Sequence, residues 1–155
     1  MKVSEYLDRN PRRLVTALSH TSIPDAMALL IENGISCLPI VNTSDEITGI
    51  ISDKDIFRAA FNNPAGFTEG VVGDLMTTNL IVGVADDDLD YIAGVMTNNR
   101  IRHIPIVDNR RLVGLLSVGD IVKSQLKNVK TENRYLWKYI YDEYPGEQAA
   151  GPDAT

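Results

Sequence analysis

Apolar residues recur along this chain in two kinds of pattern, and both patterns occur twice in the same order. Between residues 23 and 31, apolar residues fall at positions i, i+3, i+4, i+7 and i+8, which predicts a helix with one apolar face. Residues 89–96 repeat this spacing. A short extended piece precedes each helix, at residues 14–18 or 80–84, and two strands and a second helix follow it. The pattern therefore predicts β-α-β-β-α, twice.

Polar residues mark where these amphipathic helices begin and end. Ser22 with Asp25 is a candidate N-cap of the first helix, and Asp87 or Asp88 is placed to cap the second. Gly34 follows the first helix and is expected to stop it.

The segments after each amphipathic helix are apolar almost without interruption. Residues 37–41 and 47–52 form the first pair, and residues 103–107 and 112–117 form the second. Such runs are typical of strands that are covered on both faces of a sheet. The second helix of each half then begins at the end of a strand.

A duplication explains why the pattern occurs twice. A shift of 66 residues places Pro39 on Pro105, and after the next turn a shift of 65 residues places GIISDKDI (49–56) on GLLSVGDI (114–121). Two copies of this length do not suit a solenoid of short repeats. We therefore expect an α/β fold in which two β-α-β-β-α repeats form one compact module about a pseudo-twofold axis, with an added C-terminal helix.

The chain divides into five expected segments. The turn-forming stretch NNPAGFTEG predicts a linker, and the repeat pattern is finished beyond residue 124. There an aromatic stripe at helical spacing suits either packing on the chain itself or association with another chain; it comprises Trp137, Ile140, Tyr141 and Tyr144. The segments are a first repeat with its lead-in (1–62), a linker (63–71), a second repeat (72–125), an aromatic helix (126–144) and a disordered tail (145–155).

Composition narrows the class of protein. The chain has 155 residues and a formal net charge of −6, which argues against broad binding to nucleic acid. No apolar run approaches the roughly 18 residues of a membrane span, and the N-terminal stretch lacks the apolar block of a signal peptide. Cys37 is the only cysteine, which fits a reducing compartment. We therefore expect a soluble, cytoplasmic protein without membrane insertion.

Each repeat carries a serine three residues before an aspartate, where a strand gives way to a helix. Ser52 with Asp55, and Ser117 with Asp120, match the capping box, in which the two side chains accept the first free N–H groups. The same place offers N–H groups and a positive dipole end to a phosphate. The aspartate can also accept both hydroxyls of a ribose, as acidic residues do in dinucleotide folds. Capping and ligand binding are compatible, so both interpretations stay open.

The residues at the start of the strand pair differ between the halves. Arg102 and His103 occupy the second half, where Ser36 and Cys37 occupy the first. In an acidic protein this basic pair is informative, because a guanidinium holds phosphate oxygens bidentately and a protonated imidazole adds a donor. The alternative is that both side chains are merely solvated at the entrance of a strand.

Two copies of β-α-β-β-α that carry h-P-h-V and then G-h-h-S-x-x-D-h, where h is apolar, resemble a tandem pair of CBS domains, the Bateman module. The resemblance covers roughly residues 1–125 and, more weakly, the C-terminal segment of small stand-alone bacterial members. It implies a compact, often homodimeric disc whose clefts take adenosyl ligands such as AMP, ADP, ATP, NAD-type dinucleotides or S-adenosylmethionine. It further implies a non-catalytic, energy-sensing regulatory module that acts on a separate partner protein.

The resemblance also assigns roles to residues of the second repeat. Asp120 corresponds to the ribose-binding aspartate, and Ser117 to the hydroxyl residue before it. Arg102 and His103 correspond to the basic residues that meet phosphates. Ser19 corresponds to a position that closes the cleft from the opposite repeat.

The first repeat carries a second, weaker set of candidate ligand-binding residues. Asp55 and Ser52 correspond to the same ribose-side roles, with Lys54 as a candidate phosphate partner. The basic pair is missing from the equivalent places, and Ala85 stands where the closing serine would. On the resemblance, the Asp120 cleft is therefore expected to hold the phosphorylated nucleotide.

Other function classes are less well supported by the sequence. Cys37 and His103 could pair as thiol and imidazole, but no orienting third group or oxyanion hole is evident, so we expect no enzyme. The histidines and the cysteine match no zinc spacing. The acidic residues 85–90 lack the spacing and glycine of a calcium loop and suit a helix start instead. The competing alternative is a purely structural dimerisation domain with vestigial clefts.

Overall fold

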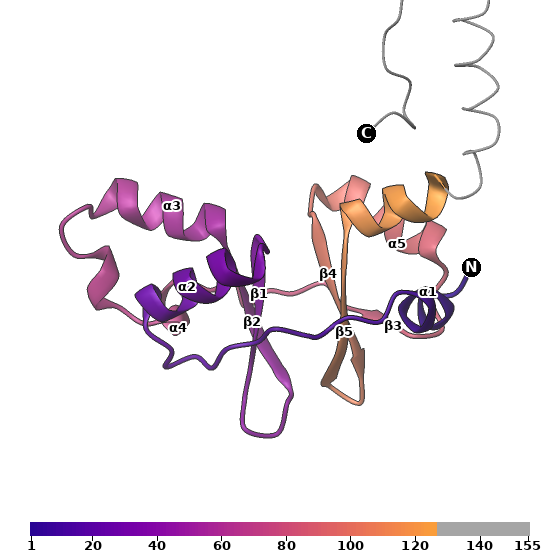
Figure 1. Cartoon of the computed structure of the whole chain (residues 1–155), viewed down its shortest axis with the longest axis horizontal. Helices are drawn as coiled ribbons and strands as arrows, with labels where there is room; N and C mark the ends of the chain where they lie inside the picture. Colours follow the sequence, from indigo (N-terminus) through magenta and orange to yellow (C-terminus); the bar gives the residue numbers. More distant parts are fainter. Residues whose placement is uncertain (127–155) are drawn as a thin grey trace, which may run out of the picture. The chain divides into compact units, whose positions relative to one another are not determined.

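The computed structural model describes residues 1–126, in which helices and two small sheets alternate (Figure 1). The elements are α1 (Val3–Arg9), α2 (Ile23–Asn33), β1 (Cys37–Val41), β2 (Ile47–Ser52), α3 (Asp53–Asn62), the 3₁₀ helix η1 (Phe67–Glu69), α4 (Val72–Leu75), β3 (Gly83–Val84), α5 (Leu89–Asn99), β4 (His103–Asp108) and β5 (Arg111–Ser117). Residues 118–126 are helical. Residues 1–118 form one compact unit, and residues 119–126 lie outside it. The aromatic stripe 137–144 and the tail 145–155 lie outside the described residues.

The strands pair in the same way in both repeats. β1 is antiparallel to β2 and β4 is antiparallel to β5, with a register shift at equivalent places, after Ile40 and after Ile106. β3 adds a parallel neighbour to β4. The mixed α/β fold built from two repeats, as predicted from the duplicated pattern, is confirmed.

The extended segment that opens each repeat is shorter than the sequence predicts. β3 comprises only two residues, Gly83–Val84, and within residues 14–18 it is Ala17 alone that bridges to β1. The Ala17 N–H donates to the Pro39 carbonyl at 3.1 Å, and the Ala17 carbonyl accepts from the Val41 N–H at 2.9 Å. Two hydrogen bonds thus fasten this segment to β1.

Coverage on both faces is found for β1 but not for every strand. All five residues of β1 are buried. β2 and β5 alternate between buried and partly or fully exposed residues, so the expectation of strands covered on both faces is wrong for them. Each of these two strands has one strand neighbour among the described residues, and one of its faces remains in contact with solvent.

The helix starts differ between the repeats. The Ser22 hydroxyl accepts from the Asp25 N–H at 3.2 Å, as predicted. Asp88 occupies the N-cap of α5, but its carboxylate accepts no capping hydrogen bond. It lies instead 3.5 Å from the Lys2 ammonium, and Asp87 accepts from the backbone N–H of residue 84. The predicted cap is wrong here because the two carboxylates bind other partners.

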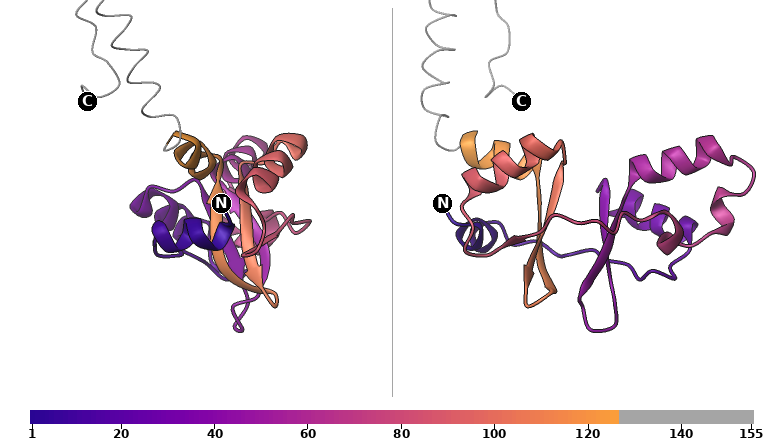
Figure 2. Two further views of the ribbon diagram at one scale, coloured as in Figure 1. Left: turned by 90° about the vertical axis from the view of Figure 1, so that its right-hand side faces the viewer. Right: turned by 180° about the vertical axis from the view of Figure 1, so that it is seen from behind.

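The short lead-in helices of the two repeats are exchanged. α1 precedes the first repeat, yet the Val3 N–H donates to the Asp87 carbonyl at 2.9 Å, beside α5 (Figure 2). α4 precedes the second repeat, yet the Val72 N–H donates to the Thr21 carbonyl at 2.8 Å. The exchange ties the two halves together, because each repeat is completed by a segment from the other half.

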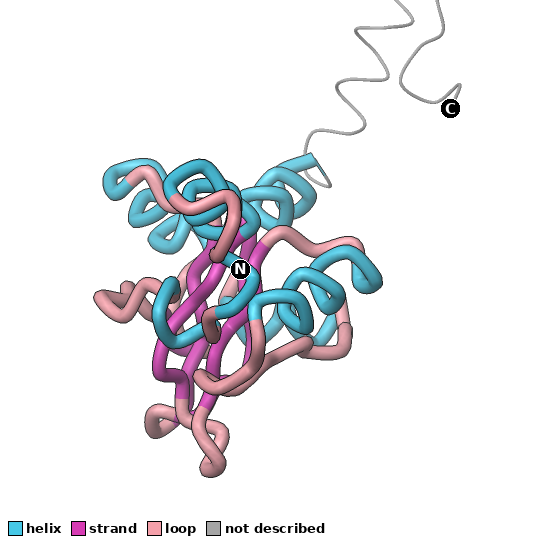
Figure 3. Tube along the Cα trace, turned by 90° about the vertical axis from the view of Figure 1, so that its left-hand side faces the viewer, coloured by secondary structure: helices cyan, strands magenta, loops and turns pink. Residues whose placement is uncertain are grey.

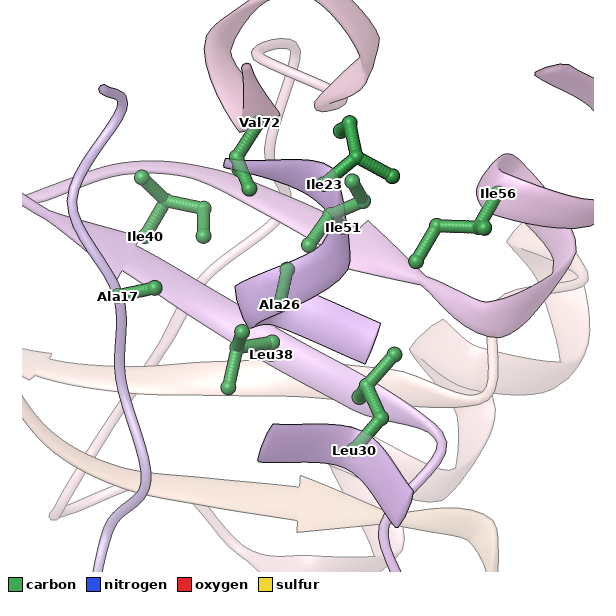
Figure 4. Close-up of a cluster of buried hydrophobic side chains, with 9 residues drawn as sticks. All are labelled: Ala17, Ile23, Ala26, Leu30, Leu38, Ile40, Ile51, Ile56 and Val72. Carbon is green, nitrogen blue, oxygen red and sulfur yellow. The ribbon is translucent and has the colours of Figure 1, made fainter. Parts of the chain in front are cut away.

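The buried core of the first repeat includes the exchanged helix α4. Side chains from β1, β2, α2, α3 and α4 converge on one cluster (Figure 4). Its members are Ala17, Ile23, Ala26, Leu30, Leu38, Ile40, Ile51, Ile56 and Val72. Val72 is fully buried, so the core of the first repeat is not complete within residues 1–62.

The two β-hairpins are joined near their tips. In Figure 1 and Figure 3 the hairpin loops of the two sheets lie at the same end. The Ile47 N–H donates to the Arg110 carbonyl at 3.2 Å, and the Leu112 N–H donates to the Asp45 carbonyl at 3.0 Å. These bonds connect the two repeats within residues 1–118.

Candidate functional site

A pocket with a volume of about 300 Å³ is lined by residues of both repeats. The first repeat contributes the start of β1 (36–37) and the junction of β2 with α3 (52–55). The second repeat contributes residues 100–103, which connect α5 to β4. The segment that leads into β3, including residues 79–81, forms a further part of the wall. Two strand starts and one helix N-terminus therefore meet at a single cavity.

Four of the seven predicted site residues line this pocket. Ser52 and Asp55 come from the first repeat, and Arg102 and His103 come from the second. The basic pair of the second repeat thus shares a pocket with the serine and the acid of the first, and its expected pairing with Asp120 of its own repeat stays a prediction. The sequence could not show this, because the pairing depends on how the two repeats pack.

The other three predicted residues lie elsewhere. Ser19 is exposed, and its carbonyl accepts from the Gly73 N–H at 2.8 Å. Ser117 lies opposite His103 in the β4–β5 ladder, as Ser52 lies opposite Cys37 in β1–β2. Asp120 is 7% exposed and lies outside the compact unit 1–118. The ligand-binding roles of Ser19, Ser117 and Asp120 stay predictions.

Asp55 and Ser52 form the capping box that the sequence predicts. The Asp55 N–H donates to the Ser52 hydroxyl at 3.2 Å, and the Asp55 Oδ2 accepts from the Ser52 N–H at 2.9 Å. Among residues 1–126, the second carboxylate oxygen of Asp55 has no hydrogen-bond partner. Capping therefore engages one oxygen and leaves the other available at the pocket.

Three cations line the same pocket without a partner. The side chains of Lys54, Arg100 and Arg102 form no ion pair or hydrogen bond within residues 1–126. Asp53 and Asp55 are the two acids of the lining. A surplus of unpaired positive charge at one cavity of a chain with net charge −6 favours an anionic ligand.

The buried thiol in the pocket lining is held in its neutral form. Cys37 is 2% exposed, and burial, assisted by the nearby carboxylates of Asp55 and Asp53, raises the pKa of its thiol from 9.0 to about 12. Burial disfavours the thiolate, and the two negative charges disfavour it further. Because the thiolate is the nucleophilic form, this environment does not activate Cys37.

The raised pKa predicts a loss of stability in alkaline solution. Between pH 9 and 12 the unfolded chain releases the Cys37 proton while the folded chain retains it, so the free energy of unfolding falls as the pH rises. The contribution is about 1 kcal/mol per pH unit in this window. Urea unfolding of the wild type and of Cys37→Ala across this range measures it. A Cys37→Ala variant with the same pH slope as the wild type would contradict the prediction.

Several lining residues were not among the sequence predictions. Thr77, Asn79 and Ile81 come from the segment before β3, which carries no motif. The sequence does contain an indication that Arg100 is unusual, because the shift of 66 residues aligns it with Gly34, the helix stop of the first repeat. A charged residue at an aligned glycine position is a departure that the repeat itself does not explain.

Among residues 1–126, no helix has both the length and the apolar character that crossing a bilayer requires. The same residues contain no group of three or more histidine, cysteine or acidic side chains that could hold a metal ion.

The sequence profile of the CBS domain matches residues 3–62 and again residues 72–127. Among curated proteins, the L-aspartate semialdehyde sulfurtransferase of Methanocaldococcus jannaschii is 34% identical over 120 residues, which cover 77% of this chain and 22% of that protein. The chain spans between 22% and 62% of the length of the first three curated relatives.

Two similar solved structures contain adenosyl ligands. The CBS domain pair of protein MJ0100, in complex with 5′-methylthioadenosine and S-adenosyl-L-methionine, is 33% identical with a TM-score of 0.72, over 84% of this chain and 98% of the other. CBSX2 in complex with AMP is 27% identical with a TM-score of 0.70, over 81% and 96% of the two chains; the curated CBSX2 protein is that of Arabidopsis thaliana.

Proposed function

The chain belongs to the CBS-domain family, and we propose that it binds an adenosyl ligand in the pocket described above and thereby regulates a separate partner protein. The observation that carries the proposal is one pocket where, among the described residues, Asp55 has an unengaged oxygen and three cations have no partner. The adenosyl ligands of two similar structures support it.

Each part of an adenine nucleotide has a chemical counterpart in the lining. The free oxygen of Asp55 accepts ribose hydroxyls, while its other oxygen keeps α3 capped. Lys54 and Arg102 bind phosphate oxygens, with His103 beside them. Apolar side chains such as Ile81 contact the base. By the internal repeat, Ser117 and Asp120 serve a second cleft, which Ser19 closes.

The regulatory part of the proposal is a shift between arrangements of the repeats. A ligand that touches both repeats favours the arrangement it binds best, by no more than its difference in affinity. We place this sensor in the cytoplasm as a homodimer that responds to the balance of AMP, ADP and ATP. It performs no catalysis, in keeping with the neutral Cys37 thiol.

Thermal melting with a ligand panel tests the proposal. AMP, ADP, ATP, S-adenosylmethionine and 5′-methylthioadenosine are compared with GMP as a matched control. A ligand present at 100 times its dissociation constant stabilises the folded state by about 2.7 kcal/mol, so at least one adenosyl compound should raise the midpoint. If no adenosyl compound raises it, the structural dimerisation domain becomes the better account.

A further inference from the structure

Helices α2 and α5 end in the same conformation but with different residues. Gly34 ends α2 with φ 60°, and its N–H donates to the carbonyls of Leu30 and Ile31. Arg100 ends α5 with φ 53°, and its N–H donates to the carbonyls of Met96 and Thr97. The two positions are equivalent in the repeat, and both lie in the left-handed region that glycine occupies most readily.

Arginine is an unfavourable residue in this conformation. A side chain beyond Cβ crowds the backbone at positive φ, and among non-glycine residues asparagine and aspartate tolerate it best. Nothing lies within 4 Å of a Cβ built at Gly34. A side chain at this helix end would therefore have no packing partner at its Cβ, so packing gives no reason for a residue other than glycine. An arginine at such a position points to a role for its side chain.

The surroundings of Arg100 indicate what that role is. Arg100 is exposed, lines the pocket with Arg102 and Lys54, and forms no side-chain hydrogen bond or ion pair with the described residues. The chain thus places a second unpaired guanidinium two residues before Arg102, at the rim of a cavity that also contains Asp55. A guanidinium in this setting attracts phosphate and gains little from an uncharged nucleoside.

We propose that Arg100 is a specificity-determining residue, which makes the pocket prefer a phosphorylated adenosyl ligand over an uncharged one. The proposal rests on the proposed function, because it assumes that the pocket binds adenosyl compounds. It goes further in assigning the discrimination between a nucleotide and its nucleoside to one residue. Asp55 recognises the part that the two ligands share, whereas Arg100 recognises the part that differs.

The chain contains a matched control for this residue. Arg110 is also an exposed arginine with positive φ, at 69°, but it lies in the β4–β5 turn and outside the pocket. There Asn109 and Arg110 both have positive φ, as a two-residue hairpin turn requires. Arg100→Gly and Arg110→Gly therefore remove the same charge and relax the same backbone conformation, one inside the pocket and one outside.

Calorimetric titration of AMP and of adenosine into the wild type and both variants tests the proposal. Arg100→Gly should bind AMP at least about tenfold more weakly and adenosine as the wild type does. Arg110→Gly should bind both ligands as the wild type does. Arg100→Lys, which retains the positive charge, should fall between the wild type and Arg100→Gly for AMP. Without ligand, both glycine variants should melt at a higher temperature than the wild type.

The other possible outcomes contradict either the role of Arg100 or the binding of these ligands. Unchanged AMP affinity in Arg100→Gly, or an equal loss for AMP and adenosine, overturns the role of Arg100 while leaving the adenosyl site in place. An equal loss of AMP affinity in Arg110→Gly shows that net charge alone is responsible, which also overturns it. A wild type that binds neither AMP nor adenosine overturns this inference, whereas the proposed function falls only if no adenosyl compound of the melting panel binds.

Discussion

Ile51→Ala should lower the free energy of unfolding by about 2–5 kcal/mol. Ile51 is fully buried in β2 and belongs to the cluster that joins β1, α2, α3 and the exchanged helix α4. Removal of its side chain loses apolar burial and leaves a cavity between elements that belong to both halves of the sequence. Urea unfolding followed by circular dichroism measures the change. Since a domain of this size has a total stability of 5–15 kcal/mol, the variant should be visibly less stable.

Ile31→Ala is the control for this prediction. Ile31 is the same residue type in the adjacent helix α2, but it is 77% exposed. Its truncation should change the free energy of unfolding by no more than about 0.5 kcal/mol. Equal effects of the two substitutions would show that the cluster is not the stabilising core of the first repeat.

The sequence predicted those parts of the fold that depend on local pattern. The stop at Gly34 and the capping box of Ser52 with Asp55 are each encoded within a few residues, and the structure contains both. The predicted apolar face of α2 is buried at Ile23, Ala26 and Leu30, whereas Ile31 at its end is exposed. The single-residue bridge of Ala17 and the ion pair of Asp88 with Lys2 depend on distant segments. Local periodicity carries no information about such contacts, so the sequence did not predict them.

In the candidate site, too, the local features could be predicted from the sequence and the contacts between distant segments could not. Ser52 and Asp55 are adjacent in one motif, and their geometry could be derived from that motif alone. That Arg102 and His103 share a cavity with them depends on how one repeat packs against the other. The internal alignment did contain one unused signal, because an arginine at residue 100 replaces the glycine that the helix end favours. A departure from an internal repeat is therefore as informative as the repeat itself.

Under the proposed function, the exchange of the lead-in helices would let a ligand in the pocket couple the two repeats. α4 belongs to the sequence of the second half but packs in the core of the first, and residues 77–81 lead from it along the pocket into β3. A ligand in the pocket touches this connection as well as both strand starts. Under the proposal, binding would thereby be linked to the relation between the halves, as a regulatory module requires.

Asp55→Ala should weaken AMP binding about a hundredfold. Loss of the carboxylate removes charge-assisted hydrogen bonds to two ribose hydroxyls, each worth about 1.5–3 kcal/mol, although part of this is regained by solvation. The substitution also removes one half of the capping box at the start of α3, which costs about 1 kcal/mol of stability. Calorimetric titration at a temperature well below the melting midpoint separates the effect on binding from the effect on stability.

Asp74→Ala supplies the matched control, because it removes a cap without touching the pocket. The Asp74 carboxylate accepts from the Val71 N–H at 3.2 Å at the start of α4, the same role that Asp55 has at α3. Asp74 is not part of the pocket lining. The two variants should therefore lose similar stability, whereas only Asp55→Ala should lose affinity for AMP. If both retain full affinity, Asp55 is a helix cap alone, and the ribose of any bound nucleotide must be recognised by other residues.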